Sequence, residues 1–160
     1  MENVNTRFSK NIQASLLASG WFEGRSADIT NTISLIRDNG MEVFLSLELF
    51  LKEFDKLRVE TVIDGGIEKV FLFDVYRGIK ELKYLEFLPD FKEAIGCKNL
   101  GIIGYANTDW TILIDENYGI YIVDTQNINF FGTSDIGIEN LLSYGDCKKV
   151  ALPDWWWDKY

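Results

Sequence analysis

The adjacent carboxylates Asp115 and Glu116 are the clearest candidates for chemistry in this sequence. Two acidic side chains can act as general acid and general base, or can bind a divalent cation. Both uses need the carboxylates to converge, whereas neighbours in a strand point to opposite faces and acids are common in turns. A small-molecule enzyme or sensor is therefore the less favoured hypothesis, and a deep pocket lined by Asp74, Asp115 or Glu116 would support it.

Other catalytic and metal-binding arrangements lack their usual residues. The chain has 160 residues, no histidine and two cysteines, Cys97 and Cys147, which are outside any CxxC spacing. This excludes a Ser-His-Asp triad and a Cys-His nucleophile and argues against a zinc site. Glycine-rich phosphate loops of the GxGxxG or GxxxxGK[ST] type are also absent. We therefore expect no catalytic residue, no bound metal and no cofactor.

Charge limits the classes of partner. Sixteen Lys and Arg against twenty-five Asp and Glu give a net charge of −9. Such a chain repels phosphate backbones and anionic lipid surfaces, so we expect neither direct nucleic-acid binding nor membrane binding. Most of the excess lies between Leu100 and Cys147, a segment with seven acids and no Lys or Arg. Aromatic residues are interleaved with these acids, as is typical of protein interfaces.

Hydrophobic spacing predicts which elements position these residues. Helices are predicted over residues 8–19, between Asp28 and Gly40, from Ser46 to Phe54 and from Leu88 to Gly96, with Asp28 and Ser46 as N-caps. Alternating residues predict a hairpin over 57–75, and then strands at 100–105, 110–115, 120–124 and 127–131. A last helix begins near Ser134 or Asp135.

Helices followed by a run of hairpins predict an α+β fold. We expect one domain over residues 1–160, with an antiparallel sheet of about six strands packed against N-terminal and C-terminal helices. A chain of this length hides roughly 70% of its unfolded surface, so it needs no disulfide. The polar N-terminus lacks an apolar leader and no window reaches about 20 apolar residues, which favours a cytoplasmic protein with reduced thiols.

The order of several motifs resembles a known family. These are Gly20-Trp21-Phe22-Glu23-Gly24-Arg25, Phe50-Leu51-Lys52-Glu53-Phe54, Leu57-Arg58-Val59, Phe71-Leu72-Phe73-Asp74, Leu100-Gly101-Ile102-Ile103-Gly104, and Leu113-Ile114-Asp115-Glu116 with Gly119 and Tyr121. Over roughly residues 8 to 145, the chain resembles the third subgroup of the SUKH superfamily. The resemblance implies a SUKH-like fold and a bacterial immunity protein that neutralises a polymorphic toxin, many of which are nucleases. It implies no catalytic residues and no particular binding site, and a regulatory or scaffold module is the alternative.

A toxin inhibitor of this kind works by stoichiometric binding, and the acid-rich segment suits a basic toxin because opposite charges accelerate association. The predicted partner-binding face consists of Asp109, Asp115, Glu116, Tyr118, Asp124, Asp135 and Glu139. Tyr118 lies in a turn, where we expect it to be exposed and to anchor the complex. Trp110 is instead predicted to be a buried core residue on its strand.

Aromatic residues outside that segment have mainly structural interpretations. Trp21 follows a predicted helix end, so we expect it to pack there while Arg25 binds exposed carbonyls. Residues 148–160 form a tryptophan-rich tail in which Trp155, Trp156 and Trp157 cannot all face the same way. The tail either folds back over the core or exposes an apolar patch, which could join two copies of the chain as a homodimer.

Overall fold

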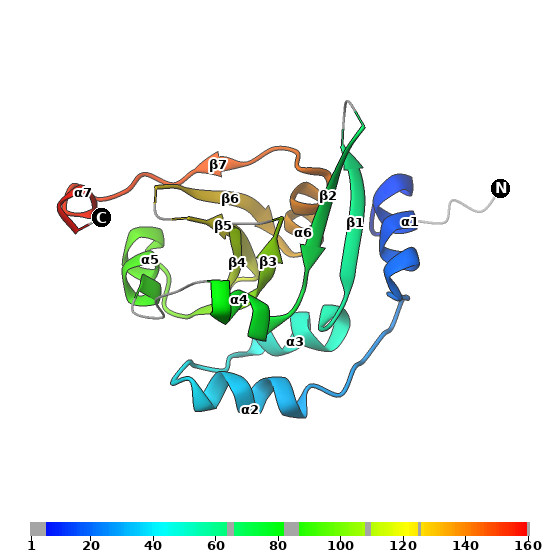
Figure 1. Ribbon diagram of the computed structural model, residues 1–160, viewed down its shortest axis with the longest axis horizontal. Helices are drawn as coiled ribbons and strands as arrows, with labels where there is room; N and C mark the ends of the chain where they lie inside the picture. Colours follow the sequence, from blue (N-terminus) through cyan, green and yellow to red (C-terminus); the bar gives the residue numbers. More distant parts are fainter. Residues whose placement is uncertain (1–5, 64–65, 82–86, 108–109, 125, 160) are drawn as a thin grey trace.

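The computed structural model describes residues 6–63, 66–81, 87–107, 110–124 and 126–159 (Figure 1). Its helices are α1 (Lys10–Ser19), α2 (Thr30–Asp38), α3 (Leu45–Phe54), α4 (Val75–Glu81), α5 (Leu88–Ile95), α6 (Ser134–Ser143) and α7 (Trp156–Lys159). Its strands are β1 (Arg58–Ile63), β2 (Ile67–Leu72), β3 (Leu100–Ala106), β4 (Trp110–Asp115), β5 (Gly119–Val123), β6 (Ile128–Thr133) and β7 (Lys148–Lys149). No helix in these ranges is long and apolar enough to cross a membrane.

The described strands form one antiparallel sheet in the order β1-β2-β3-β4-β5-β6-β7, so every strand pairs with its neighbour in the sequence. The prediction of an α+β fold with helices before and after an antiparallel sheet is confirmed. The sheet has one strand more than expected, because the tail adds the two-residue β7 beside β6. Two predicted turns, at 64–66 and 107–109, lie partly outside the described residues.

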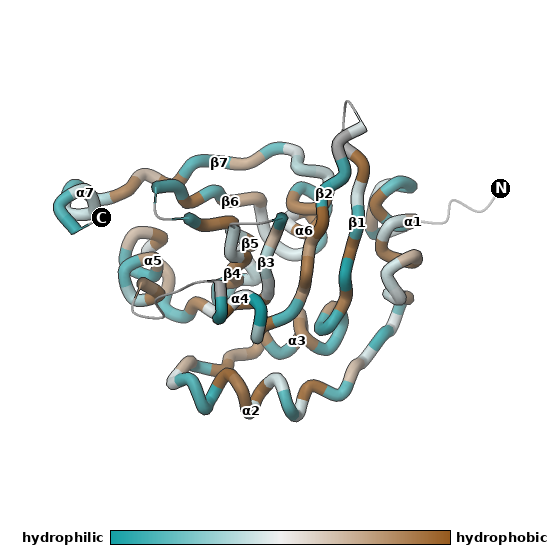
Figure 2. Tube along the Cα trace, in the orientation of Figure 1, coloured by the Kyte–Doolittle hydropathy of each residue, from teal (hydrophilic) through white to brown (hydrophobic). Residues whose placement is uncertain are grey.

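Helices cover both faces of the central strands. Ile112 and Ile114 of β4 point into a large apolar cluster shared with α1, α3 and α6. Leu113 and Tyr121 point the other way, into a second cluster that includes Phe91 of α5. Because both faces are buried, β4 and β5 contain nearly continuous apolar runs in place of a strict alternation. In Figure 2 the outer helix α2 instead alternates between brown and teal along its length.

The predicted end of the first helix is confirmed, and two predicted N-caps are corrected. Gly20 ends α1 with a φ of 101°, a conformation that favours glycine. Asp28 is not the N-cap of α2: the cap is Ile29, and the Asp28 carboxylate, one residue earlier, accepts a hydrogen bond from the Thr30 N–H at 3.0 Å. Ser46 is not a cap: it lies inside α3, where its hydroxyl donates to the carbonyl oxygen of Asp115 at 2.6 Å. This bond ties α3 to the end of β4.

The hairpin ends earlier than predicted, because Asp74 begins a helix that hydrophobic spacing did not reveal. Its carboxylate accepts a hydrogen bond from the Tyr76 N–H at 3.0 Å, and α4 begins between them. In α4, Gly78 packs directly on β3: a Cβ at this position would lie 2.8 Å from the Gly104 carbonyl oxygen. The glycine therefore allows the helix to contact the sheet backbone.

Trp21 and Arg25 have the structural roles expected of them. Trp21 is buried, and its indole N–H donates to Glu53 at 3.0 Å. Arg25 donates to the carbonyl oxygens of Glu53 and Asp55 at 2.6 and 2.9 Å, where α3 ends. Trp110 departs from its prediction, since it is only half-buried and stacks on Tyr144 with ring centroids 5.7 Å apart.

The tryptophan tail combines both of the alternatives that its sequence allowed. Trp156 is 1% exposed and packs on Phe91, with ring centroids 5.3 Å apart. Trp157, one residue later, is 61% exposed, and Trp155 lies half-buried. One indole therefore anchors the tail to α5 while its neighbour faces solvent.

Candidate partner-binding surface

Asp115 organises the turn between β4 and β5. Its Oδ1 accepts hydrogen bonds from the N–H groups of Asn117 and Gly119, both at 2.8 Å. Its Oδ2 accepts one from the Tyr121 hydroxyl at 2.7 Å, and the side chain is buried. A carboxylate whose oxygens are both engaged inside the fold cannot contribute to an exposed acidic face. The structure therefore removes Asp115 from the predicted partner-binding set.

Glu116 and Asp124 also shape loops. The two oxygens of Glu116 accept hydrogen bonds from the backbone N–H groups of Lys98 and Asn99, at 2.8 and 2.9 Å. Asp124 accepts from the N–H groups of Gln126 and Asn127, each at 2.7 Å. Glu116 precedes β5 and Asp124 follows it, so the two acids lie at opposite ends of this strand. Asp109 lies outside the described residues.

Asp135 and Glu139 lie together, next to the N-terminal segment. Arg7 donates two hydrogen bonds to Asp135, at 2.9 and 2.7 Å, which is the forked geometry that guanidinium groups form with carboxylates. The same side chain donates to Glu53 at 2.6 Å and to Glu23 at 3.2 Å. We call Arg7, Glu23, Glu53 and Asp135 the Arg7 cluster. Glu139, one turn after Asp135, accepts from the backbone N–H of Ser9 at 3.2 Å.

The Arg7 cluster keeps an acidic excess, since three carboxylates surround one guanidinium. Hydrogen bonds to Asp135 and Glu53 raise the pKa of Arg7 above its ordinary value. Tyr118 lies beside the cluster and is half-buried, contrary to the expectation of an exposed turn residue. Its ring packs near Phe50, with centroids 6.2 Å apart, and burial together with Glu53 and Asp135 raises its pKa.

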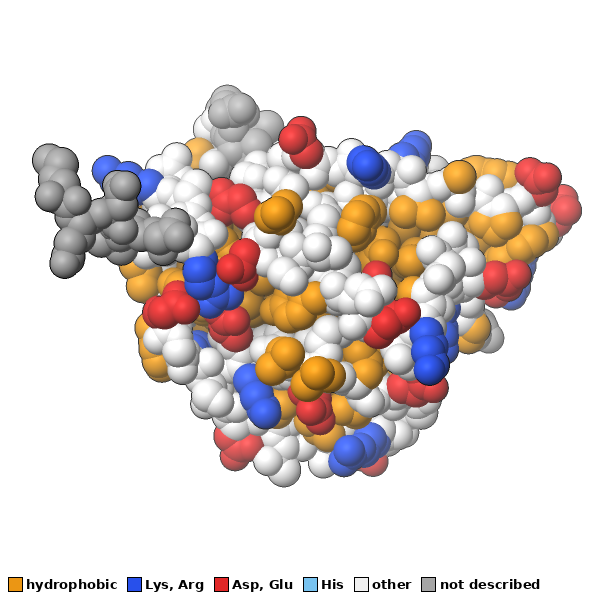
Figure 3. All heavy atoms as spheres, turned by 180° about the vertical axis from the view of Figure 1, so that it is seen from behind, with side chains coloured by type: hydrophobic (Ala, Val, Ile, Leu, Met, Phe, Trp, Pro, Cys, Tyr) orange, Lys and Arg blue, Asp and Glu red, His pale blue; other side chains and the backbone are white. Residues whose placement is uncertain are grey.

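The sequence did not predict Glu23, Glu53 and Arg7 as part of this surface. They precede the acid-rich segment, and their contacts join positions as far as 128 residues apart, for which no local pattern exists. Figure 3 shows the result on one face of the molecule: acidic, basic and hydrophobic side chains are intermixed, without a continuous acidic patch. The uniformly acidic face expected from the segment's composition is therefore not formed on this side.

The other side of α6 borders an apolar hollow of about 530 Å³. We call it the α6 groove; it is lined by Phe130, Phe131, Gly132, Ile136, Asn140, Asp146, Cys147 and Lys148. Ile136 is 69% exposed at the edge of this hollow, so its side chain extends the apolar surface that a partner could contact. The groove and the Arg7 cluster thus flank the same helix.

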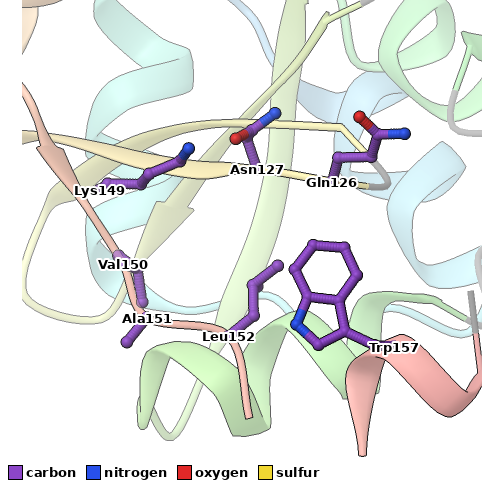
Figure 4. A pocket seen from close by; sticks show the side chains of 7 residues that line it. All are labelled: Gln126, Asn127, Lys149, Val150, Ala151, Leu152 and Trp157. Carbon is purple, nitrogen blue, oxygen red and sulfur yellow. The ribbon is translucent and has the colours of Figure 1, made fainter. Parts of the chain in front are cut away.

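A second hollow, of about 500 Å³, lies beside the tail (Figure 4). We call it the tail hollow; it is lined by Gln126, Asn127, Lys149, Val150, Ala151, Leu152 and Trp157. Figure 4 shows Leu152 and the indole of Trp157 on one side and the amides of Gln126 and Asn127 on the other. The hollow therefore combines apolar and hydrogen-bonding surface.

Neither these two hollows nor a third, beside α5, is lined by Asp74, Asp115 or Glu116. No group of three or more potential metal ligands occurs among the described residues. Burial raises the pKa of the half-buried Cys97 thiol to about 11, so it is protonated at neutral pH. These observations give the carboxylate-enzyme alternative no support.

Comparison with known families gives the surface its context. The model that describes the SUKH-3 immunity protein family matches residues 8–144. The chain belongs to the SUKH-3 immunity protein family. The resemblance seen in the sequence motifs is thereby confirmed, and the family supports an immunity role against a toxin. No curated protein and no solved structure matches the chain.

The two hollows differ in how much of their lining lies inside the residue range matched by the family. Most of the α6 groove belongs to β6 and α6, inside the range shared by SUKH-3 immunity proteins. The tail that lines the second hollow lies beyond residue 144 and therefore outside that range. The α6 groove is thus mostly inside the residue range matched by the family, and the tail hollow is mostly outside it.

Proposed function

We propose that this protein neutralises a cognate toxin by binding it stoichiometrically and covering its active surface, without transforming a substrate. The observation that carries this proposal is the SUKH-3 family match over residues 8–144. A further support is the kind of surface found beside α6, where exposed apolar side chains and carboxylates lie next to each other. Apolar contact area with a charged rim is typical of protein interfaces.

A basic toxin, such as a nuclease with a positively charged substrate groove, fits the charge of this protein. The net charge of −9 attracts a basic partner at long range and accelerates encounter. Asp135, Glu139 and Glu23 are the acids at the α6 side that would face it. Asp135 and Glu139 remain from the predicted face, and Glu23 is added to it. Asp115, Glu116 and Asp124 are left out because their carboxylates accept hydrogen bonds within the chain's own turns and loops.

We place the protein in the bacterial cytoplasm as the immunity component of a polymorphic toxin system. Its two cysteines are free, as is usual for proteins in a reducing compartment. The alternative is a regulatory or scaffold module with a partner unrelated to toxins. The neighbouring gene separates the two, since an immunity protein is expected beside a large secreted protein with a variable C-terminal toxin domain.

Co-expression with the toxin domain encoded next to the gene tests the proposal. We expect cells that produce both proteins to survive, and the purified pair to form a one-to-one complex whose association slows as salt rises. The Arg58→Ala variant, which removes only an exposed ion pair with Glu60, should protect equally well. Death of the co-expressing cells, or failure of the purified proteins to bind, would contradict the proposed function.

Self-association through the tail is a second, independent proposal. Trp157 exposes its indole beside the tail hollow, which offers apolar surface from Leu152 and Val150. A second copy of the chain could cover this surface in a two-fold symmetric contact, giving a homodimer.

A further inference from the structure

Helix α6 has two unlike exposed sides. Asp135 and Glu139 are four residues apart, so they lie on one side of the helix, which faces Arg7 and Ser9. Ile136 and Asn140 have the same spacing and lie on the next side, where they line the α6 groove. One helix thus carries a row of carboxylates and, beside it, the wall of an apolar hollow.

Two glycines allow α6 to pack closely on β6 beside the groove. Gly132 has a φ of 115°, and a Cβ at this position would lie 3.3 Å from the Cγ2 atom of Ile136. A Cβ on Gly137 would lie 2.8 Å from the carbonyl carbon of Gly132, so α6 approaches β6 through these two residues. Asn140 donates to the Phe131 carbonyl oxygen at 2.9 Å and fixes the helix above the strand. The wall and the floor are therefore held by the fold itself.

The chemistry of the lining defines the occupant. Phe130, Phe131 and Ile136 supply apolar surface, and a hollow of about 530 Å³ has room for a large aliphatic or aromatic side chain. The two charged residues of the lining, Asp146 and Lys148, have opposite charges, whereas Asp135 and Glu139 lie on the adjacent side of the helix, next to Arg7 and Ser9. The acidic excess therefore lies on that adjacent side of α6, where Glu139 joins the three carboxylates and one guanidinium of the Arg7 cluster, and it complements basic residues next to an apolar anchor.

We infer that the α6 groove receives an apolar side chain of the toxin, carried on a segment flanked by Lys or Arg. This inference rests on the proposed function and specifies where the toxin binds. The buried anchor provides most of the affinity, and the acids around it orient the segment. Toxin binding then covers Ile136 and the neighbouring Cys147, which is exposed in the free protein.

Surface plasmon resonance with the purified toxin domain from the adjacent gene tests the groove. We expect Ile136→Glu and Ile136→Lys to raise the dissociation rate at least tenfold, with the larger effect from lysine because it also repels the basic flanks. Val62→Glu is the matched control: Val62 of β1 is β-branched, and at 72% its exposure is close to that of Ile136. Because Val62 does not line the groove, this variant should bind like the wild type.

Alkylation of Cys147 is the second measurement and needs no substitution. Iodoacetamide should label Cys147 in the free protein and react at least tenfold more slowly in the complex, while the half-buried Cys97 reacts slowly in both. If Ile136→Lys binds as tightly as the wild type, or if labelling of Cys147 is unchanged in the complex, the groove assignment is overturned. Absence of any wild-type complex would instead overturn the proposed function.

Discussion

Arg7 and Asp135 lie 128 positions apart in the chain and are joined by two hydrogen bonds of 2.9 and 2.7 Å. Because Arg7 also donates to Glu53 of α3, one guanidinium connects the N-terminal segment, the third helix and the sixth. The side chain is stacked near the rings of Phe8 and Trp21 as well. Arg7 is thus a structural link between distant segments and, at the same time, the cation that reduces the net negative charge of the Arg7 cluster.

Replacing Arg7 with alanine should destabilise the protein by roughly 2 kcal/mol, because half-buried carboxylates lose their charged hydrogen-bond donor. Urea unfolding measures this change. The control, Arg58→Ala, removes an ion pair that is exposed on both sides and should cost less than about 1 kcal/mol. Equal effects of the two substitutions would show that the Arg7 cluster contributes no more than an ordinary surface pair.

Asp115 is expected to matter for folding and not for binding. Asp115→Ala leaves two backbone N–H groups and the Tyr121 hydroxyl without their acceptor, at a cost of about 3 kcal/mol. Tyr121→Phe removes one of these bonds and should cost about 1–2 kcal/mol. Thermal unfolding checks both values, with Asp154→Ala at an exposed tail position as the control. A fully stable Asp115→Ala variant with weakened toxin binding would restore the original assignment of Asp115 to the interface.

Asp55 should make stability fall as pH rises. Its side chain is buried; Oδ2 accepts from the Thr32 hydroxyl at 2.6 Å, and Oδ1 has no hydrogen-bond partner among the described residues. Desolvation raises the pKa of Asp55 above the ordinary 3.8. Between the pKa of Asp55 in the unfolded state and its higher pKa in the folded state, the folded state holds more protons. Stability therefore declines as pH increases between these two pKa values.

The Asp55→Asn variant tests this sign. The difference in free energy of unfolding between Asp55→Asn and the wild type should favour the variant more at pH 7 than at pH 4, because the substitution removes the buried charge. Asp28→Asn should show the opposite trend, because hydrogen bonds from Thr30 lower the pKa of Asp28 and its stabilising effect is lost as pH falls. Urea titrations at the two pH values decide the matter, and parallel pH profiles for the two variants would refute the prediction.

The adjacent indoles of the tail should behave very differently. Trp156→Ala removes a buried ring from the Phe91 contact and should cost about 3–5 kcal/mol, whereas Trp157→Ala should change stability by less than about 0.5 kcal/mol. If the tail joins two copies, Trp157→Ala converts a dimer to a monomer in analytical ultracentrifugation. A wild-type chain that sediments as a monomer at high concentration would exclude the dimer.

Local patterns in the sequence predicted the local elements well. The apolar spacing of α1, α2 and α3, the glycine at position 20 and the turn before β5 all depend on residues a few positions apart. Helix α4 was not predicted, because only Val75 and Ile79 mark its buried side and charged residues surround them. The structural role of Asp115 was detectable in principle, since an Asp that precedes Asn117 and Gly119 is typical of a side-chain-capped turn.

The site could be predicted only in part, because long-range pairing has no local pattern. Composition drew attention to the acids after residue 100, but whether an acid is exposed depends on which donors the fold brings to it. Glu116 meets backbone N–H groups 17 and 18 positions earlier, and Asp135 meets a guanidinium from the opposite end of the chain. Counting charges cannot distinguish these acids from freely exposed ones.

Because α6 has a buried side and an exposed side, selection for folding and selection for partner binding act on different residues of one helix. Ile138, Leu141 and Leu142 are buried in the core and constrained by folding, whereas Ile136 faces solvent and contributes little to stability. Mutations at the outward position can therefore accumulate at almost no thermodynamic penalty. A lineage of such proteins could follow a changing toxin by altering that side alone, while the scaffold beneath remains intact.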